Sequence, residues 1–428
     1  NTTASDNVAV GYQALDANTT GASNTAVGTN ASLSITTNSY TTAVGYNALT
    51  VNTASGNTAV GWEALHTNTT GVRNTAMGYE AMSLNTASYN CAFGHSALKN
   101  NTTGQEMCAF GQFSLLSNTT GTQNSGFGGG SLQNNTEGDR NTAIGRDTLI
   151  TNTTGSDCTA VGFDALNDNT TGNNNTAVGG YCLDGNTTGT ENCALGKSAL
   201  GSNTTGSYNT GIGREALLDQ TTANYNTALG YRAGKNTTGT QNTFAGVDAG
   251  VTNTSGANNC FFGYDAGEAA TTGNGNTYMG FQCGLNATDG SNNVALGNAS
   301  GTDAVFNIGA HGDRIVIGNN SNTNAYIKID WTVTSDKRDK IEDGTLGLGL
   351  DFVNKLNPKS FYFRKNRDSD ETAGQKRYGF FAQDILELEG SDNVIIDNED
   401  PENLKYKGEH LVPVLVNAVK ELSAKNDE

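Results

Sequence analysis

The sequence predicts a mainly β protein, dominated by a parallel β-solenoid (β-roll) of 18 coils with about 17 residues per coil. Three observations predict this fold class. Gly supplies 55 of the 428 residues and hydrophobic residues only 35%, so each structural unit has only a thin core. A short motif recurs at a nearly constant interval over residues 1–301, and residues 331–428 lack this motif.

The repeat is most easily followed through the Gly that ends each Ala-Val-Gly-like triplet. Of the seventeen intervals between these glycines, fourteen are 17 residues and three are 16. The consensus N-T-T-G-x-x-N-T-A-V-G-x-x-A-L-x-x is clear in residues 186–200. A period this short excludes a pair of helices and fits one coil of two short strands and two turns. The repeat glycines are Gly11, Gly28, Gly45, Gly61, Gly78, Gly94, Gly111, Gly128, Gly145, Gly162, Gly179, Gly196, Gly213, Gly230, Gly246, Gly263, Gly280 and Gly297.

Each part of the coil has an expected role. Thr-Ala-Val supplies a strand, and Asn and Gly supply the turns because both tolerate left-handed backbone angles. Stacking at about 4.8 Å makes a rod of roughly 85 Å. We expect the Val, Leu or Phe before the repeat Gly, and the Leu of the Ala-Leu pair, to form buried ladders. Asn and Thr ladders should bond coil to coil, and side-by-side association of three rods, a homotrimer, would complete the core.

The last five coils depart from the consensus. Ala-Leu becomes Ala-Gly or Cys-Gly in four coils and Ser-Gly in the fifth, so one ladder loses its Leu. Two interpretations are open: a change in local packing, or a narrower rod whose chains approach more closely. The glycines concerned are Gly234, Gly250, Gly267, Gly284 and Gly301.

The seven cysteines replace small residues of the repeat. Such positions favour buried free thiols, with a disulfide between Cys91 and Cys108 as the less favoured alternative. The Cys and His spacing shows no zinc motif, so we expect no metal and no cofactor. Four cysteines lie three residues before the repeat Gly: Cys91, Cys108, Cys193 and Cys260. Cys182 and Cys283 lie three residues after it, and Cys158 four before.

Charge excludes some partners. The net charge of −18 argues against nucleic acid as a partner. The sequence contains no apolar run of 18 residues, so we expect no membrane insertion. Residues 1–330 carry 10 basic and 22 acidic residues, whereas residues 331–428 carry 14 and 20. More than half of the basic residues therefore lie in the C-terminal quarter, which indicates a domain of a different kind.

A β connector, or stalk, is expected over residues 302–334. Val305–Gly309 and Arg314–Gly318 have the composition of short strands, and Ala325–Val333 alternates with period two. The predicted organisation is thus a repeat region (1–301), a tight trimeric connector (302–334) and a C-terminal domain (335–428).

The C-terminal domain begins with Ser335-Asp336-Lys337-Arg338-Asp339-Lys340. Alone, this segment is typical of a helix cap in a charged turn. Three further motifs follow in order: Leu346–Phe363, Tyr378–Asp384, and Leu404–Leu422, the last expected to form a closing helix. Together they resemble the endosialidase-type intramolecular chaperone family of serine peptidases. The resemblance implies a small α+β chaperone domain that cleaves its own chain.

The resemblance implies a Ser/Lys dyad, with Ser335 as nucleophile and Lys340 as general base. A Ser hydroxyl is a poor nucleophile, and Lys can activate it only when burial or nearby cations lower the Lys pKa. We expect trimer assembly to desolvate Lys340, with Lys337 and Arg338 adding repulsion. The cut would lie beside Ser335, on a side that the sequence leaves open. It would be a single-turnover reaction, and no multiple-turnover activity is expected.

The repeats resemble the heads of trimeric autotransporter adhesins and, more closely, the repeat regions of bacteriophage tail fibres. This resemblance implies a homotrimeric virion protein that attaches to the host surface, with a cell-surface glycan as the expected receptor. Two alternatives remain. A bacterial surface adhesin would be expected to carry a C-terminal membrane anchor. An ice-binding solenoid would need Thr at two fixed positions in nearly every coil, which Thr53-Ala54 and Thr136-Glu137 interrupt.

Overall fold

A computed structural model describes residues 3–303, 307–322, 335–364, 367–390, 394–399 and 401–427. The chain divides into two compact units. The solenoid unit comprises Asn1–Thr302 and Asn307–Ile317, and the C-terminal unit comprises Asp303–Phe306 and Gly318–Glu428. Within the described residues, no helix has the length and apolar character needed to cross a membrane.

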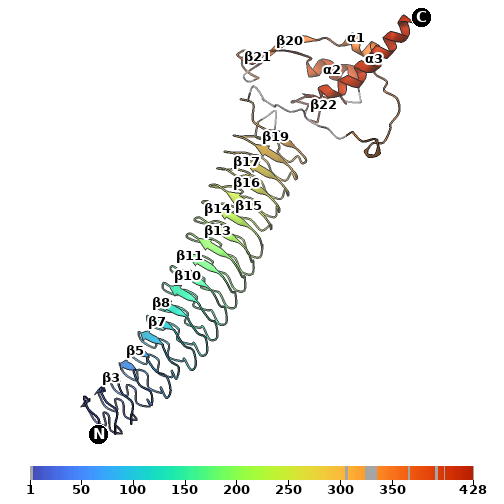
Figure 1. Ribbon diagram of the computed structural model, residues 1–428. Helices are drawn as coiled ribbons and strands as arrows, with labels where there is room; N and C mark the ends of the chain where they lie inside the picture. Colours follow the sequence, from blue (N-terminus) through green and yellow to red (C-terminus); the bar gives the residue numbers. More distant parts are fainter. Residues whose placement is uncertain are drawn as a thin grey trace. The chain divides into compact units, whose positions relative to one another are not determined.

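The solenoid unit is one parallel sheet of 19 strands, each paired with the next along the chain (Figure 1). Equivalent residues pair in register, as Thr159 does with Thr176 and Ala160 with Ala177. The predicted parallel β-solenoid is confirmed. The strands are β1 (Val8–Val10), β2 (Thr25–Val27), β3 (Thr42–Val44), β4 (Thr58–Val60), β5 (Thr75–Met77), β6 (Cys91–Phe93), β7 (Cys108–Phe110), β8 (Ser125–Phe127), β9 (Thr142–Ile144), β10 (Thr159–Val161), β11 (Thr176–Val178), β12 (Cys193–Leu195), β13 (Thr210–Ile212), β14 (Thr227–Leu229), β15 (Thr243–Ala245), β16 (Cys260–Phe262), β17 (Thr277–Met279), β18 (Val294–Leu296) and β19 (Ile315–Ile317).

Each repeat contributes one strand, so the expected second strand is wrong. The rest of the coil is built from turns in which three non-glycine positions take left-handed angles, for example Glu191, Ser198 and Leu200 with φ of 57°, 57° and 53°. These turns still bond to the next coil, as when the Leu200 amide donates to the Ala216 carbonyl at 2.9 Å. A 17-residue coil therefore closes by repeated sharp turns while its backbone stays hydrogen bonded between coils.

The core contains one of the two expected apolar ladders. Leu200 is fully buried and the equivalent Leu residues of the other coils are buried, as predicted. The residue before the repeat Gly points outward instead: Leu195 is 47% exposed, whereas Ala194 is fully buried. Side chains alternate along a strand, so in a three-residue strand the middle residue faces inward and both neighbours face outward. The prediction for the residue before Gly is therefore wrong.

Buried asparagines bond from coil to coil, as predicted. The amide of Asn152 donates to Oδ1 of Asn135 at 2.7 Å, and that of Asn169 donates to Oδ1 of Asn152 at 2.8 Å. Thr hydroxyls form another ladder beside the Asn ladder, since Thr153 Oγ1 donates to the Thr170 carbonyl at 3.0 Å. The amides of Asn135, Asn152 and Asn169 are thus paired between coils, which removes the cost of burying an unsatisfied polar group.

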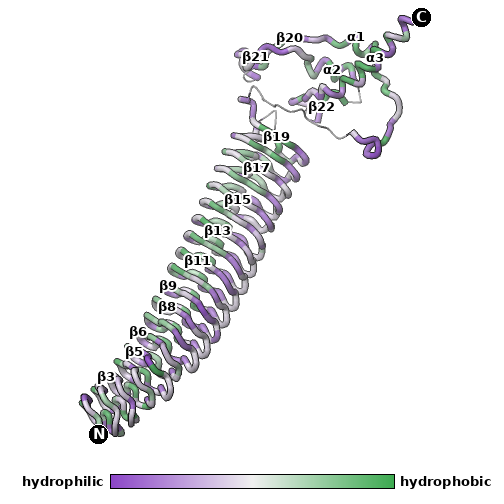
Figure 2. Tube along the Cα trace, viewed as in Figure 1, coloured by the Kyte–Doolittle hydropathy of each residue, from purple (hydrophilic) through white to green (hydrophobic). Residues whose placement is uncertain are grey.

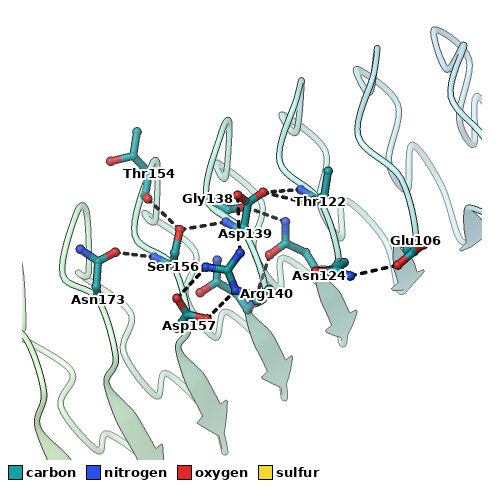
Figure 3. Close-up of polar contacts among 12 residues, drawn as sticks. Glu106, Thr122, Asn124, Gly138, Asp139, Arg140, Thr154, Ser156, Asp157 and Asn173 are labelled. Carbon is teal, nitrogen blue, oxygen red and sulfur yellow. Dashed lines mark hydrogen bonds and ion pairs between the residues drawn. The ribbon is translucent and has the colours of Figure 1, made fainter.

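Polar side chains also link neighbouring coils on the surface (Figure 3). Arg140 donates from Nε and Nη2 to the two carboxylate oxygens of Asp157 at 2.7 and 2.8 Å. The Thr122 amide donates to Asp139 Oδ1 at 2.7 Å. The exposed Arg140–Asp157 pair contributes little to stability by itself, because water screens it.

The last coils exchange Leu for an aromatic residue in the core. The coil of Gly234 keeps Ala228 as its inward strand residue, and the Phe244 ring of the next coil lies beside Gly234. In the coils of Gly250, Gly267 and Gly284, the inward strand residue is no longer Ala. Phe244, Phe261 and Tyr278 take its place and are fully buried. A Cβ built on Gly267 would lie 2.6 Å from the Phe261 ring. The local-packing interpretation is therefore confirmed: a large strand residue fills the space that Leu fills elsewhere.

All seven cysteines are free thiols. Cys158, Cys182 and Cys283 are buried, as expected. Cys193 is exposed and the three other cysteines of the strand position are half-buried, so the expectation of burial is wrong for this group. The reason is again strand alternation, which turns the first strand residue outward. Cys91 and Cys108 pair in register on β6 and β7 without a disulfide.

The predicted connector is only partly described. Arg314–Gly318 contains β19, which extends the solenoid sheet beyond the repeats. Of Val305–Gly309, the described residues 307–309 do not form a strand, and Ile308 is buried in the solenoid core. The expected strand is therefore wrong there. The alternating segment Ala325–Val333 lies outside the described residues.

Asp184 provides a test of the packing between coils. Its pKa is raised to about 6, first by partial burial and then by repulsion from Asp168 and Asp164. Because the folded pKa exceeds the unfolded value, the contribution of Asp184 to stability is full below about pH 4 and is lost as pH rises through about 6. We expect Asp184→Asn to stabilise the fold at pH 7 by about 1 kcal/mol, allowing for solvent screening. Thermal unfolding at pH 7 and pH 4 checks this.

The gain for Asp184→Asn should be nearly absent at pH 4, where the native carboxyl is already protonated. Asp219→Asn, at an exposed position, is the control and should change neither curve. An equal gain for Asp184→Asn at both pH values would contradict the electrostatic explanation.

The C-terminal unit is small and mixed α/β. Its predicted helix, Pro turn and strand over 346–363 are confirmed, as is a closing helix. Residues 404–406 do not belong to that helix, because Lys405–Tyr406 pairs antiparallel with Ile396–Asp397. The elements are the 3₁₀ turns η1 (Lys337–Asp339) and η2 (Gly408–His410), the helices α1 (Leu350–Lys355), α2 (Ala382–Glu389) and α3 (Leu411–Asn426), and the strands β20 (Lys359–Arg364), β21 (Thr372–Gly379), β22 (Ile396–Asp397) and β23 (Lys405–Tyr406).

The helices and a strand of this unit share a compact core. Phe352 of α1, Ile385 of α2, Ile396 of β22 and Val414 of α3 are buried together. Glu421 of α3 also accepts a hydrogen bond from the Leu350 amide at 2.8 Å, which satisfies a free N–H at the start of α1. The last motif of the sequence thus supports the first helix of the unit.

Candidate functional site

The candidate site is one short turn at the start of the C-terminal domain. Asp336 caps η1: its Oδ1 accepts a hydrogen bond from the Arg338 amide at 2.8 Å. The Arg338 guanidinium returns to the same carboxylate, at 3.1 Å from Nε and 2.5 Å from Nη2. This pairing holds the pKa of Asp336 below its usual value. A capping carboxylate and its own arginine therefore fix the turn.

The turn brings the two predicted site residues together. Lys340 Nζ donates a hydrogen bond to Ser335 Oγ at 2.5 Å. The two residues flank η1, and both are exposed in the single chain. The segment is therefore both a capped charged turn and a Ser/Lys pair. The two interpretations are compatible, because the capped turn produces the contact.

The arrangement has the geometry for proton transfer from a hydroxyl to an amine. A Lys that accepts a proton must first be neutral, and water around an exposed ammonium stabilises its charge. The single chain therefore supplies the contact but does not exclude water. In the single chain the Arg338 guanidinium is paired with Asp336. Repulsion between Arg338 and Lys340 in the assembled trimer stays a prediction.

Sequence reasoning missed the Asp336–Arg338 pair as the element that shapes the turn. The signal was present in the S-D-x-R spacing, which places the cap and its partner two residues apart. No group of three His, Cys, Asp or Glu side chains within the described ranges could hold a metal ion. The chemistry available at this site is that of Ser335, Lys340 and the peptide backbone.

Residues 335–394 match the family described as chaperone of endosialidase. The match begins at Ser335, the first residue of the candidate site. A parallel β-solenoid followed by this domain supports a tail-fibre-like protein with a C-terminal chaperone domain. No curated protein and no solved structure matches the chain.

Proposed function

We propose that this protein is a homotrimeric bacteriophage tail fibre whose C-terminal domain directs trimerisation and folding and then cleaves the chain beside Ser335. The observation that carries the proposal is the 2.5 Å contact between Lys340 Nζ and Ser335 Oγ at the first residue of the family match. The virion and the host surface are its proposed locations. A host cell-surface glycan is its proposed receptor.

The proposed cleavage follows ordinary acyl transfer. Ser335 Oγ attacks the carbonyl carbon of a neighbouring peptide bond while neutral Lys340 takes the hydroxyl proton. Lys340 then returns this proton to the leaving nitrogen as the C–N bond breaks, leaving an ester that water hydrolyses. The step requires Lys340 to lose its hydration. Assembly of three chains would remove that water, so the cut would follow correct assembly.

Helix α3 supports self-association of the C-terminal unit. Val412, Leu415, Val419 and Leu422 are 56%, 41%, 66% and 48% exposed. They recur at alternating intervals of three and four residues, which is the spacing of a coiled-coil seam. An apolar seam of this kind is stabilised when it packs against another helix, and identical helices from other copies offer the same spacing.

The repetitive rod explains the need for such a domain. The coils are so alike that strands could pair one or more coils out of register. Parallel strand pairing is also slow and leaves edges exposed during folding. A trimeric clamp at one end would set the register before the coils form. Removal of the clamp would then trap the fibre kinetically, because the folding template is lost.

The cleavage is tested with the full chain and three variants. We expect denaturing gels and mass spectrometry to show a wild-type cut beside Ser335 that Ser335→Ala and Lys340→Ala both abolish. Lys376→Ala removes an exposed lysine of β21, outside this turn, and should leave the cut intact. A wild-type chain that forms trimers and stays whole would overturn the dyad and leave the domain as a permanent trimerisation cap.

A further inference from the structure

Every strand of the solenoid presents an apolar residue to solvent. These are the third residues of β1 to β19, and none is charged or polar. None is buried in the single chain; Leu195, Met279 and Ile144 are 47%, 46% and 44% exposed. We call these residues, with the first residue of each strand, the outward stripe. The third residues are Val10, Val27, Val44, Val60, Met77, Phe93, Phe110, Phe127, Ile144, Val161, Val178, Leu195, Ile212, Leu229, Ala245, Phe262, Met279, Leu296 and Ile317.

The outward stripe carries no charge, although the chain has a net charge of −18. The first residues of its strands are Thr, Ser, Cys, Val or Ile throughout. Figure 2 shows hydrophobic residues following one side of the solenoid and hydrophilic residues following another. Soluble monomers seldom expose a continuous apolar surface larger than a few hundred Å². A surface of this kind is typical of an interface.

Residue sizes across the outward stripe are correlated. Phe is the third residue in four strands, β6, β7, β8 and β16, and in each of these the first residue is Cys or Ser instead of the usual Thr. Phe93, Phe110 and Phe127 stack with ring centroids 4.6 and 5.1 Å apart. Water imposes no limit on side-chain volume, whereas a packed neighbour does. The smaller first residue beside each Phe therefore points to a surface that is covered.

We propose that the outward stripe is the seam along which copies of this chain pack in parallel and in register. The proposal rests on the homotrimeric fibre proposed above and names its contact surface. Only a partner with the same coil-to-coil spacing can match the outward stripe along its whole length, and another copy has that spacing. The absence of charge lets chains of equal net charge approach each other.

The available area agrees with a stable interface. A strip about 85 Å long and about 10 Å wide offers roughly 850 Å² per chain, close to the ~800 Å² per partner of standard interfaces. When copies are related by rotation about an axis parallel to the rod, each residue lies at the same height as the identical residue of every other copy. The stacked Phe cluster then faces identical clusters, and Cys193 faces Cys193 of another copy.

Cys193 makes the seam testable in the full chain. One chain carries Ser335→Ala, so that cross-linking does not depend on cleavage, with Cys91, Cys108 and Cys260 changed to Ser, the residue that stands beside Phe127 in β8. The control chain also carries Cys193→Thr and Tyr225→Cys. Tyr225 is 57% exposed and lies outside the strands. Copper phenanthroline is the oxidant, and sedimentation reports the oligomeric state of each chain.

We expect the Cys193 chain to form disulfide-linked dimers on non-reducing denaturing gels, with the band lost on reduction. The Tyr225→Cys chain should remain unlinked although it sediments as the same trimer. Trimers that cross-link equally through Tyr225→Cys, or not at all through Cys193, would overturn the seam and leave the trimer standing. Monomers by sedimentation would overturn the seam together with the homotrimer.

Discussion

Gly179→Ala is expected to destabilise the solenoid by at least about 3 kcal/mol, because a side chain at the repeat Gly blocks coil stacking. Gly179 has φ of 137°, and its Cβ would lie 2.7 Å from both the carbonyl carbon and oxygen of Gly196. The blocking atoms are backbone, so no side-chain rotation can relieve the clash. The same contact recurs at every repeat Gly from Gly11 to Gly280, which explains why this residue defines the period.

Gly180 supplies a matched control at the adjacent residue. A Cβ there meets only the Phe163 carbonyl oxygen, at 3.8 Å, and no positive φ constrains the backbone. Gly180→Ala should leave stability nearly unchanged or raise it slightly through lower entropy of the unfolded chain. Thermal unfolding followed by circular dichroism compares the two variants. Similar curves for both would show that stacking does not depend on the repeat Gly.

Phe261→Ala is expected to cost about 3–5 kcal/mol, the usual range for removing a buried ring. Phe261 is fully buried and stacks on Tyr278 at a centroid distance of 4.8 Å. Its ring occupies the space that Leu fills in earlier coils, beside Gly267. Removing the ring leaves a cavity that the stacked coils cannot close, since their backbones are hydrogen bonded on both sides.

The exchange of Leu for an aromatic residue predicts a rescue. Gly267→Leu alone should be destabilising, because its Cβ would lie 2.6 Å from Phe261. Combined with Phe261→Ala it restores the Ala and Leu pair of the other coils, and Gly267 has φ of 61°, close to the 53° of Leu200. We expect the double variant to recover at least half of the lost stability in a double-mutant cycle. Additive losses would show that the two positions do not share one space.

The candidate site and its Ser/Lys pairing were predicted by motif, and the capped turn that brings the pair together was not. The S-D-x-R-x-K order pointed to Ser335 and Lys340 because three later motifs followed in sequence. Asp336 caps the turn and binds Arg338, and the turn brings Lys340 Nζ to 2.5 Å from Ser335 Oγ. This arrangement depends on backbone angles. Spacing along the chain does not specify them.

The coil shows the same division. Its period, its stacking and the hydrogen-bonded Asn ladders could be predicted from the sequence, because any residue that recurs at a fixed interval in a stacked fold must meet its own equivalents. The number of strands per coil could not be predicted. Left-handed turns at residues such as Leu200, normally unfavourable for Leu, persist only because the next coil accepts their hydrogen bonds.

The sequence by itself determined the number of repeats, the register of the ladders and the start of the C-terminal domain. It also identified the Leu of each Ala-Leu pair as a core residue. The tertiary structure decided which side chains face inward. A three-residue strand can turn either its centre or its flanks toward the core, and the hydropathy of Thr-Ala-Val favours burial of Val. The interior between strand and turns accepts Ala opposite Leu, or Phe opposite Gly, because its volume is fixed by the closed, stacked backbone. Val and its equivalents are therefore left on the outside, where only another molecule can cover them.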